Sequence, residues 1–371
     1  MVAGLETIVK GEEQAVRLLF LGDTILKSRN GGDPFSCIEE SFHDKDFIVI
    51  NLETSIVFRE KEHTLQQKSV TIKSYADELF WLLKYKGKFV FTLANNHVYD
   101  CGEDGYQDTL KFLRENGFRF VAGDSPYYLE KGSARVRLDA VYQGILNDYS
   151  RSILSFKNEY QDDCFNVLCV HWGLENVLMP SVEQIDAAHK WFRRGVHLIV
   201  GHHSHTPQGR LSGDGRLCAF SLGNLNMLHC TGEPRMMERT GLMLEVEIAD
   251  SARMEHRLIP VRLDPCFIPE PENSEAVKNL INQLDGLIPQ SESYKKRRYR
   301  LVYECHVSRN FLWDNMKHGW FPRLVKYGGA QWLMMFRWLV SKRVLFSFFF
   351  LLFNGLTRAD KIMKALNKGE S

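Results

Sequence analysis

The feature that most constrains the fold of this chain is a repeated pattern: a short apolar run ends in Asp, Glu, Asn or His. Such runs are typical of buried strands in an α/β sheet. Open α/β sheets place ligand groups outside the carboxyl ends of their strands, so we expect these polar residues to converge. The predicted strands are Arg17–Gly22, Asp46–Asn51, Phe89–Leu93, Phe165–Val170, Val196–Val200, Arg216–Leu222 and Leu242–Ile248.

Between these runs, apolar residues recur at helical spacing. This spacing predicts helices over Ala76–Tyr85, Glu103–Asn116 and Pro180–Arg194. Pro180 suits the start of the third helix, and Gly195 suits its end. The Pro-rich stretch Pro260–Pro271 is predicted to be a linker.

The residues that follow the strands are of the types that hold divalent metals, namely carboxylates, imidazoles and an amide oxygen. Two ions about 3.5–4 Å apart would clamp a phosphoryl oxygen and activate water, and such a pair needs one bridging carboxylate. Glu53 is the best placed candidate for that bridge. The candidate metal ligands are Asp23, Glu53, Asn96, His171, His203 and His205.

His97 adjoins Asn96 but need not bind metal. It is a candidate catalytic residue that protonates a leaving group, with Asp100 accepting the other ring N–H. Taken singly, each motif has an ordinary structural reading: Gly22-Asp23 as a turn, or His171 as a hydrogen-bonded structural histidine. Clustered imidazoles at strand ends are costly without partners, so the ordered set favours a metal site.

Composition bounds the cellular setting. Eight scattered cysteines without a CxxC pair, and a start that lacks the apolar core of a secretory signal, favour a reduced cytoplasmic location. The catalytic part is acidic and shows no nucleic-acid-binding motif, so nucleic acid is not expected as a partner.

The C-terminal part differs in charge and hydropathy. From Ser274 onward there are 17 Lys/Arg and 7 Asp/Glu, a local charge of +10 in a chain of net charge +1. The basic tail indicates either contact with an anionic membrane surface, which would make the protein peripheral at the inner face, or a solvated helical face. Val344–Leu356 is strongly apolar but short of the roughly 20 residues of a span. It is interpreted as packed on the domain or lying at the membrane interface.

The ordered motifs GD, NLE, ANNHVYDCGEDGYQDTL, HWGLE, GHHSHTPQG and SLGN closely resemble the CapA family of capsule and poly-γ-glutamate synthesis proteins. This family lies within the calcineurin-like metallophosphoesterase superfamily, and the resemblance runs from about Leu18 to Ile259. It implies a four-layer α/β/β/α sandwich with a dinuclear centre. We therefore predict a CapA-like domain over residues 15–272 and a basic, helical C-terminal appendage over residues 273–371.

Carried over motif by motif, the six candidate ligands look like metal-binding positions and His97 looks like the catalytic histidine. Gln208 and Asn224 match positions near the site, and His202 is left outside the ligand set. The superfamily's opening Asp-x-His is Asp23-Thr24-Ile25 here, which leaves open whether one or two divalent ions bind. Mn, Zn, Fe, Ca and Mg all remain candidates.

The resemblance implies a metal-dependent hydrolase that acts on a phosphoester or amide-type bond in cell-envelope polymer metabolism, with a small-molecule or polymer substrate. Two alternatives stay open. One is a non-hydrolytic capsule assembly or export factor that the tail holds near a capsule synthase. The other is a metal-assisted peptide epimerase, which would take up solvent deuterium without bond cleavage.

Overall fold

The computed structural model describes residues 15–66, 70–123, 125–132, 134–143, 160, 163–227, 239–249, 253–292 and 295–317. The apolar segment 344–356 and most of the basic tail lie outside these ranges. In the described part of the chain, no helix combines the length and apolar character needed to cross a bilayer.

The first large sheet contains the strands predicted to carry Asp23, Glu53 and Asn96. Its order is β16-β15-β14-β1-β2-β5-β6, and the short strand β13 also pairs with β1. β1, β2, β5 and β6 run parallel, so their carboxyl ends share one edge. The strands are β1 Val16–Thr24, β2 Phe47–Leu52, β5 Phe89–Thr92, β6 Arg119–Val121, β13 Asn224–Asn226, β14 Thr240–Ile248, β15 Met254–Leu263 and β16 Pro269–Pro271.

The second sheet carries the histidine motifs, in the order β11-β12-β10-β9-β8-β7. Its central strands β8, β9, β10 and β12 are parallel. The strands are β7 Tyr127–Lys131, β8 Ala134–Tyr142, β9 Phe165–His171, β10 Leu198–His202, β11 Arg210–Gly213 and β12 Arg216–Ala219.

Helices and a small two-stranded sheet complete the described structure. The small sheet pairs β3 with β4 in parallel, next to α1. These elements are β3 Ser55–Val57, β4 Lys73–Tyr75, α1 Gly102–Glu115, α3 Val182–Arg193, α4 Glu275–Asp285, α5 Lys296–Lys317 and the 3-10 turns η1 Glu39–Phe42, η2 Ala76–Glu78 and η3 Phe80–Tyr85.

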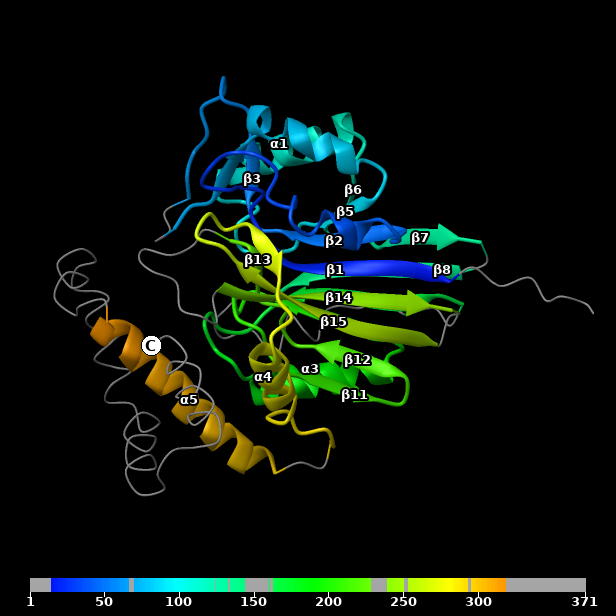
Figure 1. Ribbon diagram of the computed structural model, residues 1–371, viewed down its shortest axis with the longest axis vertical. Helices are drawn as coiled ribbons and strands as arrows, with labels where there is room; N and C mark the ends of the chain where they lie inside the picture. The colour runs from blue at the N-terminus through cyan, green and yellow to red at the C-terminus, as the bar shows by residue number, and fades with distance from the viewer. Residues whose placement is uncertain are drawn as a thin grey trace, which may run out of the picture.

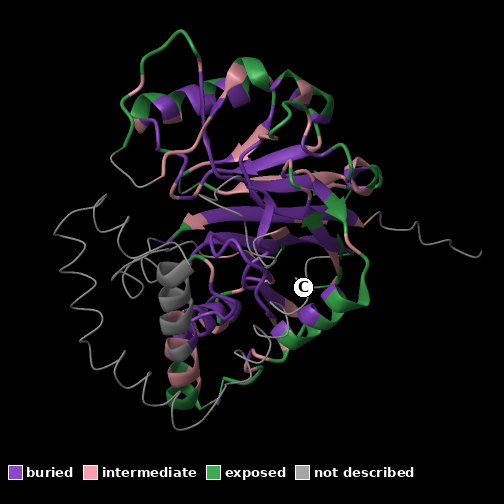
Figure 2. Ribbon diagram, turned by 60° about the vertical axis from the view of Figure 1, so that its left-hand side comes forward, coloured by how far each residue is buried: buried purple, intermediate pink, exposed green. Residues whose placement is uncertain are grey.

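Alternating apolar residues on the strands build the layers. One face of each sheet meets the other sheet, as where Phe20 of β1 and Val167 of β9 share one buried cluster. The opposite face of the first sheet packs on Leu113 of α1, and that of the second packs on Trp191 of α3. Figure 1 shows α1 and α3 on opposite sides of the stacked sheets, and Figure 2 shows the strands largely buried. The predicted α/β/β/α sandwich is confirmed.

Two local predictions are wrong. The expected helix Ala76–Tyr85 is two short 3-10 turns. Leu79, Leu82 and Tyr85 are buried at the three-residue spacing of a 3-10 turn, whereas Leu83 is exposed. The expected linker Pro260–Pro271 is largely strand. Pro260 lies inside β15, and Pro269–Pro271 forms the edge strand β16, where a missing N–H is tolerated.

The boundary predicted at residues 272/273 stays a prediction. In the structure, α4 begins just after it and packs Val277 and Ile281 against the core between the sheets. α5 then contacts α3 through ion pairs such as Arg300 with Glu183, at 2.7 Å.

Candidate metal centre

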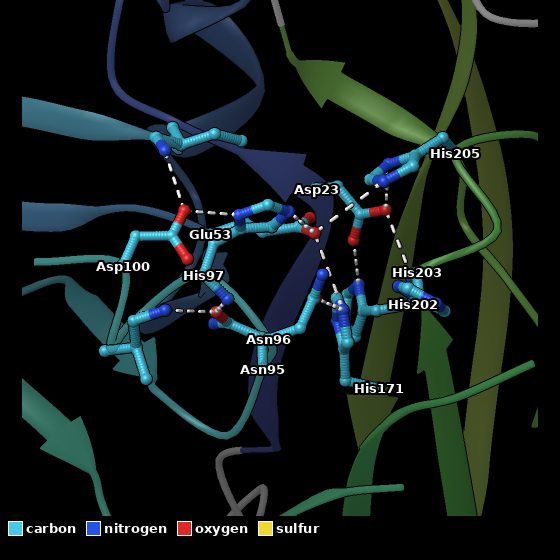
Figure 3. A network of polar contacts seen from close by, with 12 residues as sticks. Asp23, Glu53, Asn95, Asn96, His97, Asp100, His171, His202, His203 and His205 are labelled. Atoms are coloured by element: carbon cyan, nitrogen blue, oxygen red, sulfur yellow. Dashed lines mark hydrogen bonds and ion pairs between the residues drawn. The ribbon is translucent and has the colours of Figure 1, made fainter. Parts of the chain in front are cut away.

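The carboxyl ends of the parallel strands of both sheets meet at one edge and bring the candidate residues together. Asp23 of β1 is in register with Asn51 of β2, and His171 of β9 is in register with His202 of β10. Figure 3 shows side chains from both sheets pointing toward a common centre. The convergence that strand order predicts is therefore present in the structure.

Asp23 owes its position to an irregularity in β1. The pairing of β1 with β2 shifts between Leu21 and Asp23, which re-aims the side chain. Gly22, inside this shift, allows the chain to pass close to Gly223, because a Cβ at residue 22 would lie 2.2 Å from the Gly223 carbonyl oxygen. The Asp23 N–H donates to that same oxygen at 2.9 Å. A glycine at this position thus lets the chain deliver a buried carboxylate to the site.

The Asp23 carboxylate is fully buried and well supplied with partners. Asn51 Nδ2 donates to it at 2.9 Å, and His202 Nδ1 and His205 Nδ1 lie 3.1 and 3.0 Å from its oxygens. The backbone N–H of His203 also donates, at 3.2 Å. Burial by itself raises the pKa of Asp23, but hydrogen bonds from His202 and His205 outweigh it and hold the pKa well below its usual range.

Glu53 lies just beyond β2 and, unlike Asp23, has no hydrogen-bond donor. Its carboxylate is fully buried, yet neither oxygen accepts a hydrogen bond. The nearest ring nitrogens are Nε2 of His171, His205 and His97, at 3.5, 3.7 and 4.0 Å from Oε1. Burial, followed by the Asp23 charge, raises the pKa of Glu53 well above its usual range. A buried carboxylate without donors is costly unless a cation compensates it.

The loop after β10 presents His203 and His205 in backbone conformations that are uncommon for side chains with a Cβ, with φ of 87° and 55°. Neither ring nitrogen of His203 has a hydrogen-bond partner, although the residue is fully buried. Burial and the neighbouring His205 lower the pKa of His203 to about 4, so its ring is neutral and able to bind metal.

His205 and His171 complete the imidazole group. Burial by itself lowers the pKa of His205, but the charges of Glu53 and Asp23 outweigh it and raise the pKa to about 10. His205 Nδ1 also lies 3.0 Å from the Asn224 amide oxygen. Burial, and then His203, lower the pKa of His171 well below its usual range. A cation at this position would displace the proton on His205.

The loop after β5 supplies Asn96 and His97, and Asn95 fixes its shape. Asn95 Nδ2 donates to the Leu52 carbonyl at 2.7 Å, and its Oδ1 accepts the N–H groups of His97 and Val98, both at 3.0 Å. Asn96 Oδ1 then lies 2.6 Å from His171 Nε2. The strand end and the loop that follows it are thereby locked together.

His97 is held on its far side by Asp100. His97 Nδ1 lies 2.6 Å from Asp100 Oδ2, which also accepts the backbone N–H of Ile72 at 2.7 Å. Asp100 is fully buried, and Nε2 of the imidazole faces Glu53. The arrangement fits an imidazole oriented by a carboxylate.

Three overlapping residue groups in the described part of the chain could hold a cation. Two of them share Glu53, and the third adds an exposed carboxylate, Glu175, that the sequence reasoning missed. The donorless Glu53 oxygens and the bare His203 ring show that these residues fit a metal ion. The groups are Asp23/Glu53/His205, Glu53/His171/His203 and Glu175/His203/His205, with ligand atoms in each within 4.8 Å of one another.

The structure thus brings all six candidate ligands and both candidate catalytic residues to one place (Figure 3). Sequence reasoning left out His202, which lies against Asp23, as well as Asn51 and Asn95. Asn51 and Asn95 stand inside the NLE and NNH motifs, and Glu175 closes HWGLE, so each lay beside a residue already singled out.

Comparison with known proteins agrees with this architecture. Residues 17–227, more than half of the chain, match the bacterial capsule synthesis protein family PGA_cap. The chain belongs to this family. This match confirms the CapA resemblance. PGA_cap proteins fall within the metallophosphoesterase-like superfamily.

Two curated relatives are similar to this PGA_cap chain. The capsule biosynthesis protein CapA of Bacillus anthracis is 22% identical, over 57% of this chain and 60% of the relative. The PGA biosynthesis protein CapA of Bacillus subtilis (strain 168) is 25% identical, over 55% of this chain and 61% of the relative. The chain thus spans about 60% of the length of these relatives.

Solved structures similar to the PGA_cap chain are more distant. A hypothetical protein from Thermus thermophilus has 14% identity and a TM-score of 0.42, covering 66% of this chain and 99% of that one. A novel phosphatase from Mycoplasma pneumoniae has 14% identity and a TM-score of 0.35, covering 67% and 94%. Neither likeness is close enough to say anything about function.

Proposed function

We propose that this PGA_cap protein is a metal-dependent hydrolase. Its substrate would carry a phosphoester or amide-type bond and belong to the metabolism of capsule, poly-γ-glutamate or a related cell-envelope polymer. The observation that carries the proposal is Glu53, a fully buried carboxylate without a hydrogen-bond donor that faces three imidazoles. The names of the curated relatives support the polymer context.

The residues divide into two overlapping cation positions that share Glu53. Asp23 and His205 would hold a cation on one side of it. His171 and His203 would hold one on the other side, with the Asn96 amide oxygen nearby. A divalent ion held there would supply Lewis acidity, which polarises a phosphoryl or carbonyl oxygen and promotes the ionisation of water.

His97 is proposed to act on the leaving group. Asp100 accepts its Nδ1–H, which leaves Nε2 directed into the site as the atom that carries or receives a proton. The Ile72 N–H in turn fixes the Asp100 carboxylate. The imidazole can therefore donate from Nε2 without reorientation, and Asp100 is a positioning residue.

The test is turnover by protein purified without chelator, with added Mn²⁺, on an activated phosphodiester and on γ-glutamyl polymers. We expect turnover to fall to background in Glu53→Ala and His203→Ala. Asp100→Asn should lower kcat by about 10- to 1,000-fold with little change in KM, because it disturbs the orientation and proton position of His97 and removes no candidate metal ligand. Equal background rates in the wild type and both alanine variants on every substrate would count against a hydrolase.

A second candidate is a non-hydrolytic assembly factor, which the relatives' names as biosynthesis proteins favour. The protein would then be cytoplasmic and peripheral, with its basic tail on the inner membrane face near a capsule synthase. Cell fractionation and binding to anionic liposomes test this idea with the intact chain. A protein that stays wholly soluble and ignores those liposomes would rule it out.

A further inference from the structure

Glu175 lies beside the candidate metal centre and was not among the candidate ligands. It follows β9 by a few residues, and its side chain is exposed. One of its carboxylate oxygens lies within 4.8 Å of the ligand nitrogens of both His203 and His205. An ion held between His203 and His205 is therefore within reach of this carboxylate, in a group that contains neither Asp23 nor Glu53.

The backbone around Glu175 is fixed to the loop that carries these two histidines. The N–H of Asn176 donates to the Ser204 carbonyl at 2.7 Å, from a left-handed conformation with φ of 61°. Gln208 Nε2 donates to the Val177 carbonyl at 2.6 Å. Two hydrogen bonds thus hold the segment after Glu175 against the histidine loop, so this carboxylate is built into the site.

An ion held by His203 and His205 has few other protein ligands. Glu175, His203 and His205 form one group, separate from the group of Asp23, Glu53 and His205. Hard divalent ions such as Mn²⁺ and Mg²⁺ favour about six ligands, mostly oxygen, so two imidazoles leave room for a carboxylate.

We propose that Glu175 is a further metal ligand, which adds a carboxylate to a cation bound by His203 and His205. This inference rests on the metal centre proposed above. Electrostatics agree with it: the Glu175 charge is among the causes that raise the pKa of Glu53 and oppose the lowering of the His203 pKa. A third carboxylate makes the centre richer in oxygen, which favours hard cations over Zn²⁺.

The test is Mn²⁺ binding by calorimetry, with bound metal counted by elemental analysis after dialysis. We expect Glu175→Gln to weaken Mn²⁺ binding about 10- to 100-fold or to lower the count by one ion. The stability of the metal-free protein should change by no more than about 0.5 kcal/mol, since the residue is exposed. The matched control is Glu255→Gln. It removes an exposed carboxylate of β15 opposite Glu247, at the far end of the sheet from Asp23.

A second variant separates ligation from a field effect. Glu175→His removes the same charge but offers a nitrogen ligand, so it should regain Zn²⁺ affinity that Glu175→Gln lacks. If Glu175 acted only through its charge, both variants would lose metal affinity equally. That loss would fade at 0.5 M salt, because the Debye length is then only about a few ångström.

Two results overturn the inference. One is an equal, salt-sensitive loss of affinity in both variants, and the other is a metal affinity of Glu175→Gln within twofold of that of the wild type. A wild type that binds no divalent metal would overturn the proposed metal centre itself. If the wild type and Glu175→Gln bind metal with equal affinity, only the role of Glu175 is overturned. The two failures are therefore distinguishable.

Discussion

Replacing Glu53 by glutamine should separate stability from metal binding. Glu53 is fully buried, and neither carboxylate oxygen accepts a hydrogen bond. Burial and the nearby Asp23 charge raise its pKa well above the ordinary value of 4.5. In metal-free protein, the folded state therefore holds this proton more tightly than the unfolded chain does. Unfolding releases the proton, so the contribution of Glu53 to stability falls as the pH rises from about 4.5 through the raised pKa.

The size of the effect follows from linkage. One proton changes the free energy of unfolding by up to about 1.4 kcal/mol per pH unit. Glutamine does not titrate and is nearly isosteric with a protonated glutamate. Near pH 4.5, Glu53→Gln should match the wild type within about 0.5 kcal/mol. Between pH 4.5 and the raised pKa, the free energy of unfolding of the variant should rise relative to that of the wild type, by up to about 3 kcal/mol for every two pH units.

The assay is urea denaturation in the presence of chelator at several pH values, followed by the same series with Mn²⁺. Mn²⁺ at 100 times its Kd should stabilise the wild type by about 2.7 kcal/mol. Glu53→Gln should gain almost nothing, because the shared ligand has lost its charge. Glu255→Gln, far from the site, should follow the wild type in both series.

Two results would refute this reasoning. If the stabilities of Glu53→Gln and the wild type ran parallel across the pH range in chelator, Glu53 would not be a carboxylate with a raised pKa. If Mn²⁺ stabilised Glu53→Gln as much as the wild type, Glu53 would not be a metal ligand.

Two further predictions concern stability outside the ligands. Gly201→Ala would place a Cβ 1.9 Å from the Phe220 carbonyl oxygen. Chemical denaturation should therefore show a free energy of unfolding lower by about 1–3 kcal/mol or more. An unchanged denaturation midpoint would contradict that packing. Asp108 accepts hydrogen bonds from Lys61 and, at 2.8 Å, from His63; burial raises its pKa, but these partners outweigh burial and lower it. Asp108→Asn should cost about 1–3 kcal/mol near pH 7, and the cost should vanish as the pH falls from about 4 through the lowered pKa. A cost that stays constant between pH 7 and pH 3 would argue against the charged interaction.

Strand positions were predictable because burial on both faces leaves an uninterrupted apolar run that ends at a polar loop. β1, β2 and β5 follow this rule, and β9 follows it apart from the buried Asn166. The 3-10 turns over Ala76–Tyr85 and the strand character of Pro269–Pro271 were not predictable in this way. Leucines spaced three and four apart fit an α-helix and a 3-10 turn alike, and local spacing does not say that a proline will lie at a sheet edge.

The sequence by itself determined which residue types end the strands, and the order of those strands implied that the polar ends converge. It could not rank the residues once together. Only the tertiary structure surrounds Asp23 with donors while leaving Glu53 with none, because residues distant in the chain bring His202 and His205 against Asp23 alone at hydrogen-bonding distance. It also decides that Glu175 reaches the histidines, because hydrogen bonds between two loops distant in the chain hold it there. The candidate ligands are therefore local information, whereas the balance of charge and hydrogen bonds around them is set by residues far apart in sequence.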